Sequence, residues 1–144
     1  MTRNLFVYGT LMKATGQPAA MRLAGEAEFV GFASARGVLY DLLKWPGFIA
    51  SQRAVDRVHG EVWRLRDRAS LVWLDDYEGI TAGALDPEYD RIATSVRRSD
   101  GRCIRAMLYA YRRPLAGAPR IASGRWLDRS PRFAPSLGEL TAAA

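Results

Sequence analysis

The sequence predicts one α+β domain over residues 1–144, in which strands outnumber helices. A chain of 144 residues with 49% hydrophobic composition is long enough to form one hydrophobic core. Its apolar segments are mostly short and bounded by glycine or proline, as strands are, and only two segments carry the start and stop signals of helices. Four of the seven prolines lie from Pro114 onwards, so an irregular tail is expected from about residue 114.

Five segments have the composition of strands, namely 3–9, 28–42, 57–65, 89–98 and 102–112. The segment 28–42 reads either as two strands or as one strand bent at Gly37. Pro46-Gly47, within the following segment 45–51, is typical of a turn. Asp100-Gly101 is the kind of pair that closes a tight hairpin, so the last two strands are expected to be neighbours.

Two segments are predicted to be α-helices. Residues 18–25 have proline at the start and glycine just past the end. Residues 68–78 have Asp67 in position to cap the first turn and Gly79 in the position after the C-cap. A further short turn of helix is expected near residues 123–128.

The second helix ends in three acids, although negative charge is disfavoured at a helix C-terminus. At about 100° per residue, Glu78 lies on the same stripe as Leu71 and Leu74. Asp76 points away from this stripe and is expected to be a solvated surface acid, whereas Asp75 lies on its flank. Any chemistry in this group is therefore assigned to Glu78.

The expected surroundings of Glu78 favour proton transfer. Partial burial and nearby helix carbonyls both disfavour the charged form, which adapts a carboxyl to work as a general acid or base. The structural alternative is that Glu78 forms an ion pair with one of the many arginines, or is exposed to water where the helix end frays.

The end of the first strand is the second candidate site. Tyr8-Gly9-Thr10 follows an apolar strand, and glycine allows backbone N–H groups to approach a ligand closely, so this turn could hold a carboxylate or an oxyanion. No Walker phosphate loop and no GxGxxG motif is present in the sequence. The alternative is an ordinary turn at a strand end.

Several other chemistries are excluded or disfavoured by composition. The chain has one cysteine, Cys103, and one histidine, His59, so it has neither an intramolecular disulfide nor a zinc cluster. Cys103 is expected to be a small buried hydrophobic residue and His59 a structural one. No signal peptide or spanning segment of roughly 20 apolar residues is recognisable, so a soluble, cytoplasmic protein that does not contact a membrane is expected.

The net charge of +6 is concentrated in the second half of the chain. Residues 1–90 carry 10 Lys and Arg against 12 Asp and Glu, whereas residues 91–132 carry 11 against 2. Such a region either binds an acidic partner or is a solvated face. The arginines at 97–102 flank a predicted turn, which favours the solvated face and makes nucleic-acid binding unlikely.

Taken together, several motifs resemble the ordered signatures of the gamma-glutamylcyclotransferase-like superfamily. They are FVYGTL (6–11), GVLYDL with the PG that follows (37–47), GEVWRL (60–65), LDDYEG (74–79) and YDRIATSV (89–96). The resemblance implies a compact α+β fold with a mixed β-barrel-like sheet and flanking short helices, whose cavity binds a gamma-glutamyl group.

The same resemblance implies roles for individual residues. The catalytic residue of the family matches Glu78, and its substrate-binding loop matches Tyr8, Gly9, Thr10 and Leu11. Tyr40 and Tyr89 are candidates to border the cavity. The implied reaction closes a gamma-glutamyl compound to 5-oxoproline and releases an amine, without a cofactor or a metal.

The resemblance leaves the substrate open between a gamma-glutamyl amine and a gamma-glutamyl amino acid. The segment 12–18 somewhat resembles that of gamma-glutamylamine-type members but is longer. The alternative function is a non-catalytic binding module of the same fold, for a small gamma-glutamyl-like ligand or an acidic partner.

Overall fold

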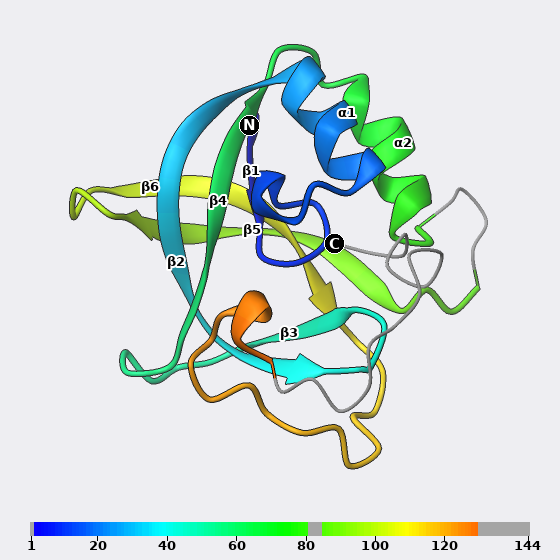
Figure 1. The fold of residues 1–144 in the computed structure, drawn as a ribbon, viewed down its shortest axis with the longest axis vertical. Coiled ribbons are helices and arrows are strands. Elements are labelled where there is room, and N and C mark those ends of the chain that lie inside the picture. The colour runs from blue at the N-terminus through cyan, green and yellow to red at the C-terminus, as the bar shows by residue number, and fades with distance from the viewer. Residues whose placement is uncertain (1, 81–84, 130–144) are drawn as a thin grey trace.

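A β-barrel with two helices beside it is the main feature of the computed structural model, which describes residues 2–80 and 85–129 (Figure 1). The helices are α1 (Pro18–Glu26) and α2 (Ser70–Tyr77), and the short 3-10 helices are η1 (Lys13–Thr15) and η2 (Trp126–Asp128). The strands are β1 (Asn4–Val7), β2 (Ala27–Asp41), β3 (Pro46–Ala50), β4 (Arg57–Leu65), β5 (Tyr89–Arg98) and β6 (Cys103–Tyr111).

The strands form one sheet that closes on itself. Their order is β3-β2-β4-β1-β6-β5, and an additional pairing of β2 with β5 completes a five-stranded barrel to which β3 is attached at its edge. The pairing of β1 with β6 is parallel and the other pairings are antiparallel, so the barrel is mixed. This confirms the α+β, barrel-like fold that the resemblance implies.

The short strand β1 lies at the centre of this architecture, between β4 and β6. Leu5, Phe6 and Val7 are each at most 1% exposed, so both faces of the strand are covered. The hydrophobic cluster that contains them also includes Leu23 of α1 and Leu74 of α2. A continuous apolar run is the pattern expected of a strand buried on both faces, and it places the end of β1 inside the molecule.

The longest strand, β2, is continuous over 15 residues, so the segment 28–42 forms one strand. Gly37 stays in register opposite Ala50 of β3, and a Cβ there would lie 2.3 Å from the Phe48 ring, so glycine is needed for close packing. The irregularity in β2 lies instead between Phe29 and Gly31, where its register with β4 shifts. The alternative of two strands was therefore wrong, and β2 is one strand that curves between its pairing with β4 and its pairing with β3 (Figure 1).

The predicted turn at Pro46-Gly47 is also wrong. Both residues belong to β3, where Pro46 pairs with Asp41 and Gly47 with Tyr40. The chain reverses just before them, where Leu43 has a positive φ of 83°. Proline is compatible with this place because it opens the strand, where its missing N–H is not needed by the sheet.

The helices start and end close to the predicted positions. Asp67 accepts a hydrogen bond of 2.8 Å from the N–H of Ala69 at the start of α2. At the other end Gly79 has a φ of 78°, its N–H donates to the Asp76 carbonyl and the Ile80 N–H donates to the Asp75 carbonyl. This pair of bonds is a Schellman motif, and it fixes the chain direction after α2.

Two further details concern the ends of the helices and the tail. Gly25 lies within α1 and not past its end, because α1 runs directly into β2. The described part of the segment after β6, up to residue 129, is mostly irregular and contains η2, and the rest of the predicted tail lies outside the described residues. The described part packs on the barrel, since the His59 N–H donates to the Gly124 carbonyl at 2.9 Å and the Ile121 N–H to the Leu39 carbonyl at 2.8 Å.

The helices of the described segments, 2–80 and 85–129, lack the combined length and hydropathy needed to cross a bilayer.

Candidate functional site

Glu78 is the C-cap residue of α2 and is buried, with 3% of its surface exposed. Leu71 and Leu74 on the same stripe are also buried, which confirms the side of the helix predicted for Glu78. The alternative in which the helix end frays into water is wrong, because the Schellman motif holds this end and the side chain points into the protein.

The other two acids of α2 have different surroundings. Asp76 is exposed, as predicted. Asp75 is partly buried and forms an ion pair with Arg91 at 3.1 Å, and it accepts a hydrogen bond of 2.7 Å from the Tyr109 hydroxyl. An acid–arginine pair thus exists at this helix end, and Asp75 provides its acid.

Four tyrosine hydroxyls lie within the electrostatic influence of Glu78. Burial, and then the nearby Glu78 carboxylate, raises the pKa of Tyr8 well above its ordinary value. Burial is also the main reason why the pKa of Tyr77 rises to about 12 and why those of Tyr89 and Tyr109 rise, and Glu78 contributes to each. The buried acid therefore lies among phenols that stay protonated at neutral pH.

Two of these tyrosines hold the barrel strands in place. The Tyr8 hydroxyl, at the end of β1, donates to the Tyr109 carbonyl of β6, and the Tyr8 ring packs against Phe48 at 5.6 Å between ring centres. The Tyr89 hydroxyl donates to the Pro46 carbonyl at 2.6 Å. Their hydroxyls thus fix β1, β3, β5 and β6 relative to one another around Glu78.

The strand-end turn over Tyr8–Leu11 lies directly beside α2. The Gly9 carbonyl accepts a hydrogen bond from the Met12 N–H at 3.0 Å, which closes the turn. Thr10 is 2% exposed and its hydroxyl is hydrogen-bonded to that of Tyr77 at 3.0 Å, while Leu11 is fully buried. The turn is therefore adjacent to the Glu78 end of the helix, and anion binding by the N–H groups of residues 9–11 stays a prediction.

Tyr40 is the one predicted site residue that the structure places elsewhere. Its neighbour Leu39 pairs with Phe48, which packs on Tyr8. Because neighbouring residues of a strand point to opposite faces, Tyr40 points away from Tyr8. Its place at the border of the cavity stays a prediction that this geometry does not support.

Two tyrosines of the cluster, Tyr77 and Tyr109, were not assigned to the site from the sequence. Tyr77 directly precedes Glu78, and Tyr109 alternates with the buried Leu108 on β6. Alternation predicts that Tyr109 faces away from Leu108. It does not predict that α2 covers that face, which depends on closure of the barrel.

Cys103 and His59 have no part in this cluster. Cys103 is exposed, so the expectation that it is buried was wrong; it begins β6 directly after the hairpin turn, where it pairs with Arg97 of β5. His59 is half-buried and lines a cavity that includes none of the residues of this cluster. Within residues 2–80 and 85–129, no group of three or more His, Cys, Asp and Glu side chains is arranged to hold a metal ion.

The fold and the site together define a class of proteins: small mixed β-barrels in which an acid at the end of a helix, here Glu78, is buried among tyrosines. The chain belongs to the family described as "Gamma-glutamyl cyclotransferase, AIG2-like", whose model matches residues 5–128. This confirms the resemblance seen in the motifs.

Among its relatives is the gamma-glutamylcyclotransferase family protein YtfP of Escherichia coli, which is 35% identical over 127 residues, covering 88% of this chain and 97% of YtfP. The solution structure of Escherichia coli YtfP superposes with a TM-score of 0.61 at 31% identity, over 87% of this chain and 96% of that one. An AIG2-like protein of Mus musculus superposes with a TM-score of 0.62 at 22% identity, over 91% and 99% of the two chains, which shows the shared fold.

Proposed function

We propose that this protein is a gamma-glutamyl cyclotransferase that acts on a gamma-glutamyl amine or a gamma-glutamyl amino acid. The products are 5-oxoproline and an amine or amino acid. Family membership supports the reaction class. The observation that carries the proposal is the burial of Glu78 among four protonated tyrosines, beside the turn that ends β1.

The reaction requires little chemistry from the protein. The substrate's own α-amine attacks its γ-carbonyl carbon, a C–N bond forms to close a five-membered ring, and the original amide C–N bond breaks. Because both groups belong to one molecule, the enzyme mainly has to hold the substrate folded. The tyrosine rings fixed around Glu78 suit that task, since they would limit the conformations open to a flexible chain.

Glu78 is proposed to move the proton. The substrate amine is an ammonium ion at neutral pH and becomes a nucleophile only when a base takes a proton from it. Of the groups in the cluster, the four phenols stay protonated and Asp75 is held by Arg91 and Tyr109, so Glu78 is the group suited to accept that proton. The resulting carboxylic acid then donates the proton to the departing nitrogen.

The turn over residues 9–11 is proposed to hold negative charge. Its N–H groups either bind the α-carboxylate of the substrate or stabilise the oxyanion that develops on the γ-carbonyl. The hydrogen bond between Thr10 and Tyr77 keeps this turn next to α2, and hence next to Glu78.

Direct detection of product tests the proposal. The protein is incubated with gamma-glutamyl amines, gamma-glutamyl amino acids and glutathione, and 5-oxoproline is measured by mass spectrometry. We expect release of 5-oxoproline from at least one class, without added metal. Binding of these compounds without turnover of any of them would instead identify the non-catalytic binding module.

A further inference from the structure

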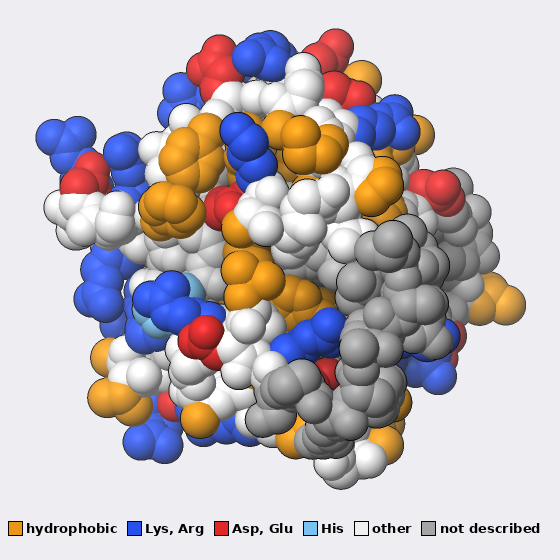
Figure 2. Space-filling model, in the orientation of Figure 1, with side chains coloured by type: hydrophobic (Ala, Val, Ile, Leu, Met, Phe, Trp, Pro, Cys, Tyr) orange, Lys and Arg blue, Asp and Glu red, His pale blue; other side chains and the backbone are white. Residues whose placement is uncertain are grey.

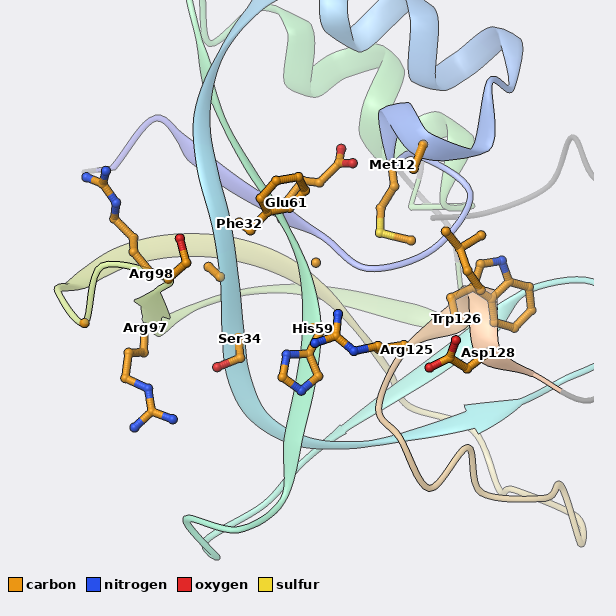
Figure 3. Close-up of a pocket in the computed structure, with 16 residues that line it drawn as sticks. Met12, Phe32, Ser34, His59, Glu61, Arg97, Arg98, Arg125, Trp126 and Asp128 are labelled. Atoms are coloured by element: carbon orange, nitrogen blue, oxygen red, sulfur yellow. The ribbon is translucent and has the colours of Figure 1, made fainter.

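A cavity of about 530 Å³ lies on the barrel wall beneath the η2 segment (Figure 3). Its lining includes neither Glu78 nor any of the four tyrosines around it. The volume falls within the range of about 300–1,000 Å³ that is typical of small-molecule sites. The proposed reaction does not account for this cavity.

One end of the cavity is basic because of the strand register. Ser34 of β2 pairs with Arg97 of β5 on one side and with His59 of β4 on the other. Residues paired directly across a sheet point to the same face, so the three side chains form a row on the cavity wall. Figure 3 shows the Arg125 side chain, from the segment before η2, reaching toward His59.

The positive charges in this row are close enough to affect one another. Burial lowers the pKa of His59, and Arg125, Arg57 and Arg97 lower it further. Burial also lowers the pKa of Arg57, with further contributions from Arg97 and Arg36. In Figure 2 the one pale-blue side chain, His59, lies under blue side chains on this face.

The nearby acids leave this charge largely uncompensated. Asp100 is paired with Arg98 at 3.2 Å, and Glu61, whose carboxylate accepts hydrogen bonds from the Lys13 N–H and the Trp63 indole N–H, is not among the charges that shift the pKa of His59. Asp128 lies at the other end of the cavity, beside Trp126 (Figure 3). Among the ion pairs between described residues, none includes Arg97 or Arg125.

Apart from Asp128, the opposite end of the cavity is mostly apolar. Met12, Phe32 and Trp126 contribute to it, from the turn after β1, from β2 and from η2. Phe32 is 60% exposed, so a ligand there would cover an aromatic ring that the protein leaves in water. A ligand that matches both ends has a compact anionic group and an apolar group.

We propose that this cavity is a binding site for a small organic phosphate. The phosphate dianion lies between Arg97 and Arg125, and its apolar part packs against Phe32 and Trp126. Two guanidinium groups without a carboxylate partner match two negative charges, and their planar N–H donors match phosphate oxygens. The proposal is independent of the reaction assigned to Glu78.

The test is a calorimetric titration with phenyl phosphate and with inorganic phosphate, in a buffer of low salt without other phosphate. We expect saturable binding of one phenyl phosphate per chain, and weaker binding of inorganic phosphate because it lacks the apolar group. Arg97→Gln and Arg125→Gln should each weaken binding of phenyl phosphate by about tenfold or more. Both side chains are exposed, so the variants should fold as the parent does, which thermal unfolding checks.

The matched control is Arg113→Gln, which removes the same charge at the other end of the β5–β6 hairpin, where Arg113 pairs with Asp86. It should bind phenyl phosphate as the parent does, and so should Glu78→Gln. Equal weakening in all three arginine variants would show binding by net charge alone and would overturn the proposal. Absence of saturable binding, or loss of binding in Glu78→Gln alone, would overturn it as well.

Discussion

At the scale of single residues, the structure gives the three acids at the end of α2 different environments. Asp76 is in water, Asp75 is neutralised by Arg91, and Glu78 is enclosed by the barrel. The carbonyls that make a helix C-terminus electronegative are partly satisfied here by the Schellman bonds of Gly79 and Ile80. Acids are therefore tolerated at this helix end for separate reasons, and Glu78 is the one to which we assign the proposed chemistry.

The first prediction concerns the two neighbours of Glu78. Asp76→Asn changes an exposed side chain and should alter the free energy of unfolding by no more than about 0.5 kcal/mol, with turnover unchanged. Asp75→Asn removes the charge that pairs with Arg91 and weakens the bond from Tyr109, so it should destabilise by about 1–2 kcal/mol. Turnover should fall but persist, since Asp75 supports the β6 wall and does not move a proton.

Urea unfolding and 5-oxoproline release measure both variants. If Asp76→Asn abolishes turnover, the catalytic acid has been assigned to the wrong residue of this group.

The main features of the site could be predicted from residues that are close in sequence. Helical periodicity alone separates Glu78 from Asp76, and an apolar strand ending in Tyr-Gly-Thr indicates the turn. The roles of Tyr109 and Arg91 could not be predicted in this way. They meet Asp75 only because β5 and β6 pass beside α2, and that contact joins residues 34 and 16 positions apart in the chain.

At the scale of elements, Glu26 connects the two helices. Its carboxylate accepts hydrogen bonds from the Ser70 hydroxyl at 2.6 Å and the Trp73 indole N–H at 2.9 Å, and it pairs with Arg22 within α1. The bonds to Ser70, Trp73 and Arg22 lower the pKa of Glu26 to about 2. Because α2 ends at Glu78, this connection also positions the site.

The second prediction is that Glu26→Gln destabilises the protein by about 1 kcal/mol at neutral pH, after allowance for solvent screening of a partly exposed group. The folded-state pKa lies below the unfolded one, so the contribution is complete above pH 4.5 and is lost as the pH falls toward 2. Urea unfolding at several pH values should show the difference between variant and parent shrinking over this range. Glu28→Gln, at an exposed position with a 4.0 Å ion pair, is the control and should show no such trend.

The third prediction concerns the segment that carries η2. Gly124 has a φ of 69°, and a Cβ there would lie 2.0 Å from the Arg57 carbonyl oxygen of β4. Gly124→Ala should therefore destabilise by about 2–4 kcal/mol, through backbone strain and loss of the contact with β4.

Gly117→Ala is the matched control for this prediction, since Gly117 has a φ of 77° with open space around it. This variant should lower the free energy of unfolding by only about 1 kcal/mol, because alanine is strained in the left-handed backbone conformation but meets no neighbouring atom. Equal effects in urea unfolding would mean that the segment is not held against β4 as described.

Strands, helices and the β5–β6 hairpin could be predicted because their signals are local. The errors occur where pairing between distant segments decides the outcome. Pro46-Gly47 is typical of a turn, yet antiparallel pairing with β2 keeps both residues in β3. Gly37 could have separated two strands, but it provides space for the Phe48 ring within the continuous strand β2.

At the scale of the whole molecule, the basic second half of the chain does not form one uninterrupted surface. Many of its arginines are paired with acids, among them Arg91 with Asp75, Arg98 with Asp100 and Arg120 with Asp56. Among the described arginines of this region, those that join no ion pair are Arg97, Arg102, Arg105, Arg125 and Arg129, and two of them, Arg97 and Arg125, line the cavity beside His59. A long polyanion such as DNA would therefore meet few unpaired arginines spaced to match its phosphates.

The fourth prediction is that the protein binds duplex DNA weakly and only at low salt. Anisotropy of a labelled duplex should show weak affinity that is lost between about 50 and 200 mM salt, because such binding rests only on phosphate contacts by solvated arginines, and added salt opposes the counterion release that drives those contacts. Nanomolar, sequence-selective binding at physiological salt would contradict this and would favour an acidic macromolecule as the partner of the chain.

The measurement that tests the central claim most directly compares Glu78→Gln with the parent, in 5-oxoproline release and in thermal midpoint. Glutamine keeps the size and most of the hydrogen-bonding capacity of Glu78 but cannot accept and return a proton. We expect turnover to collapse by about 100-fold or more, while the melting midpoint stays at or slightly above that of the parent, because a buried charge is removed. Substantial turnover in Glu78→Gln, or an unfolded variant, would show instead that Glu78 is a structural residue and that the proposed mechanism is wrong.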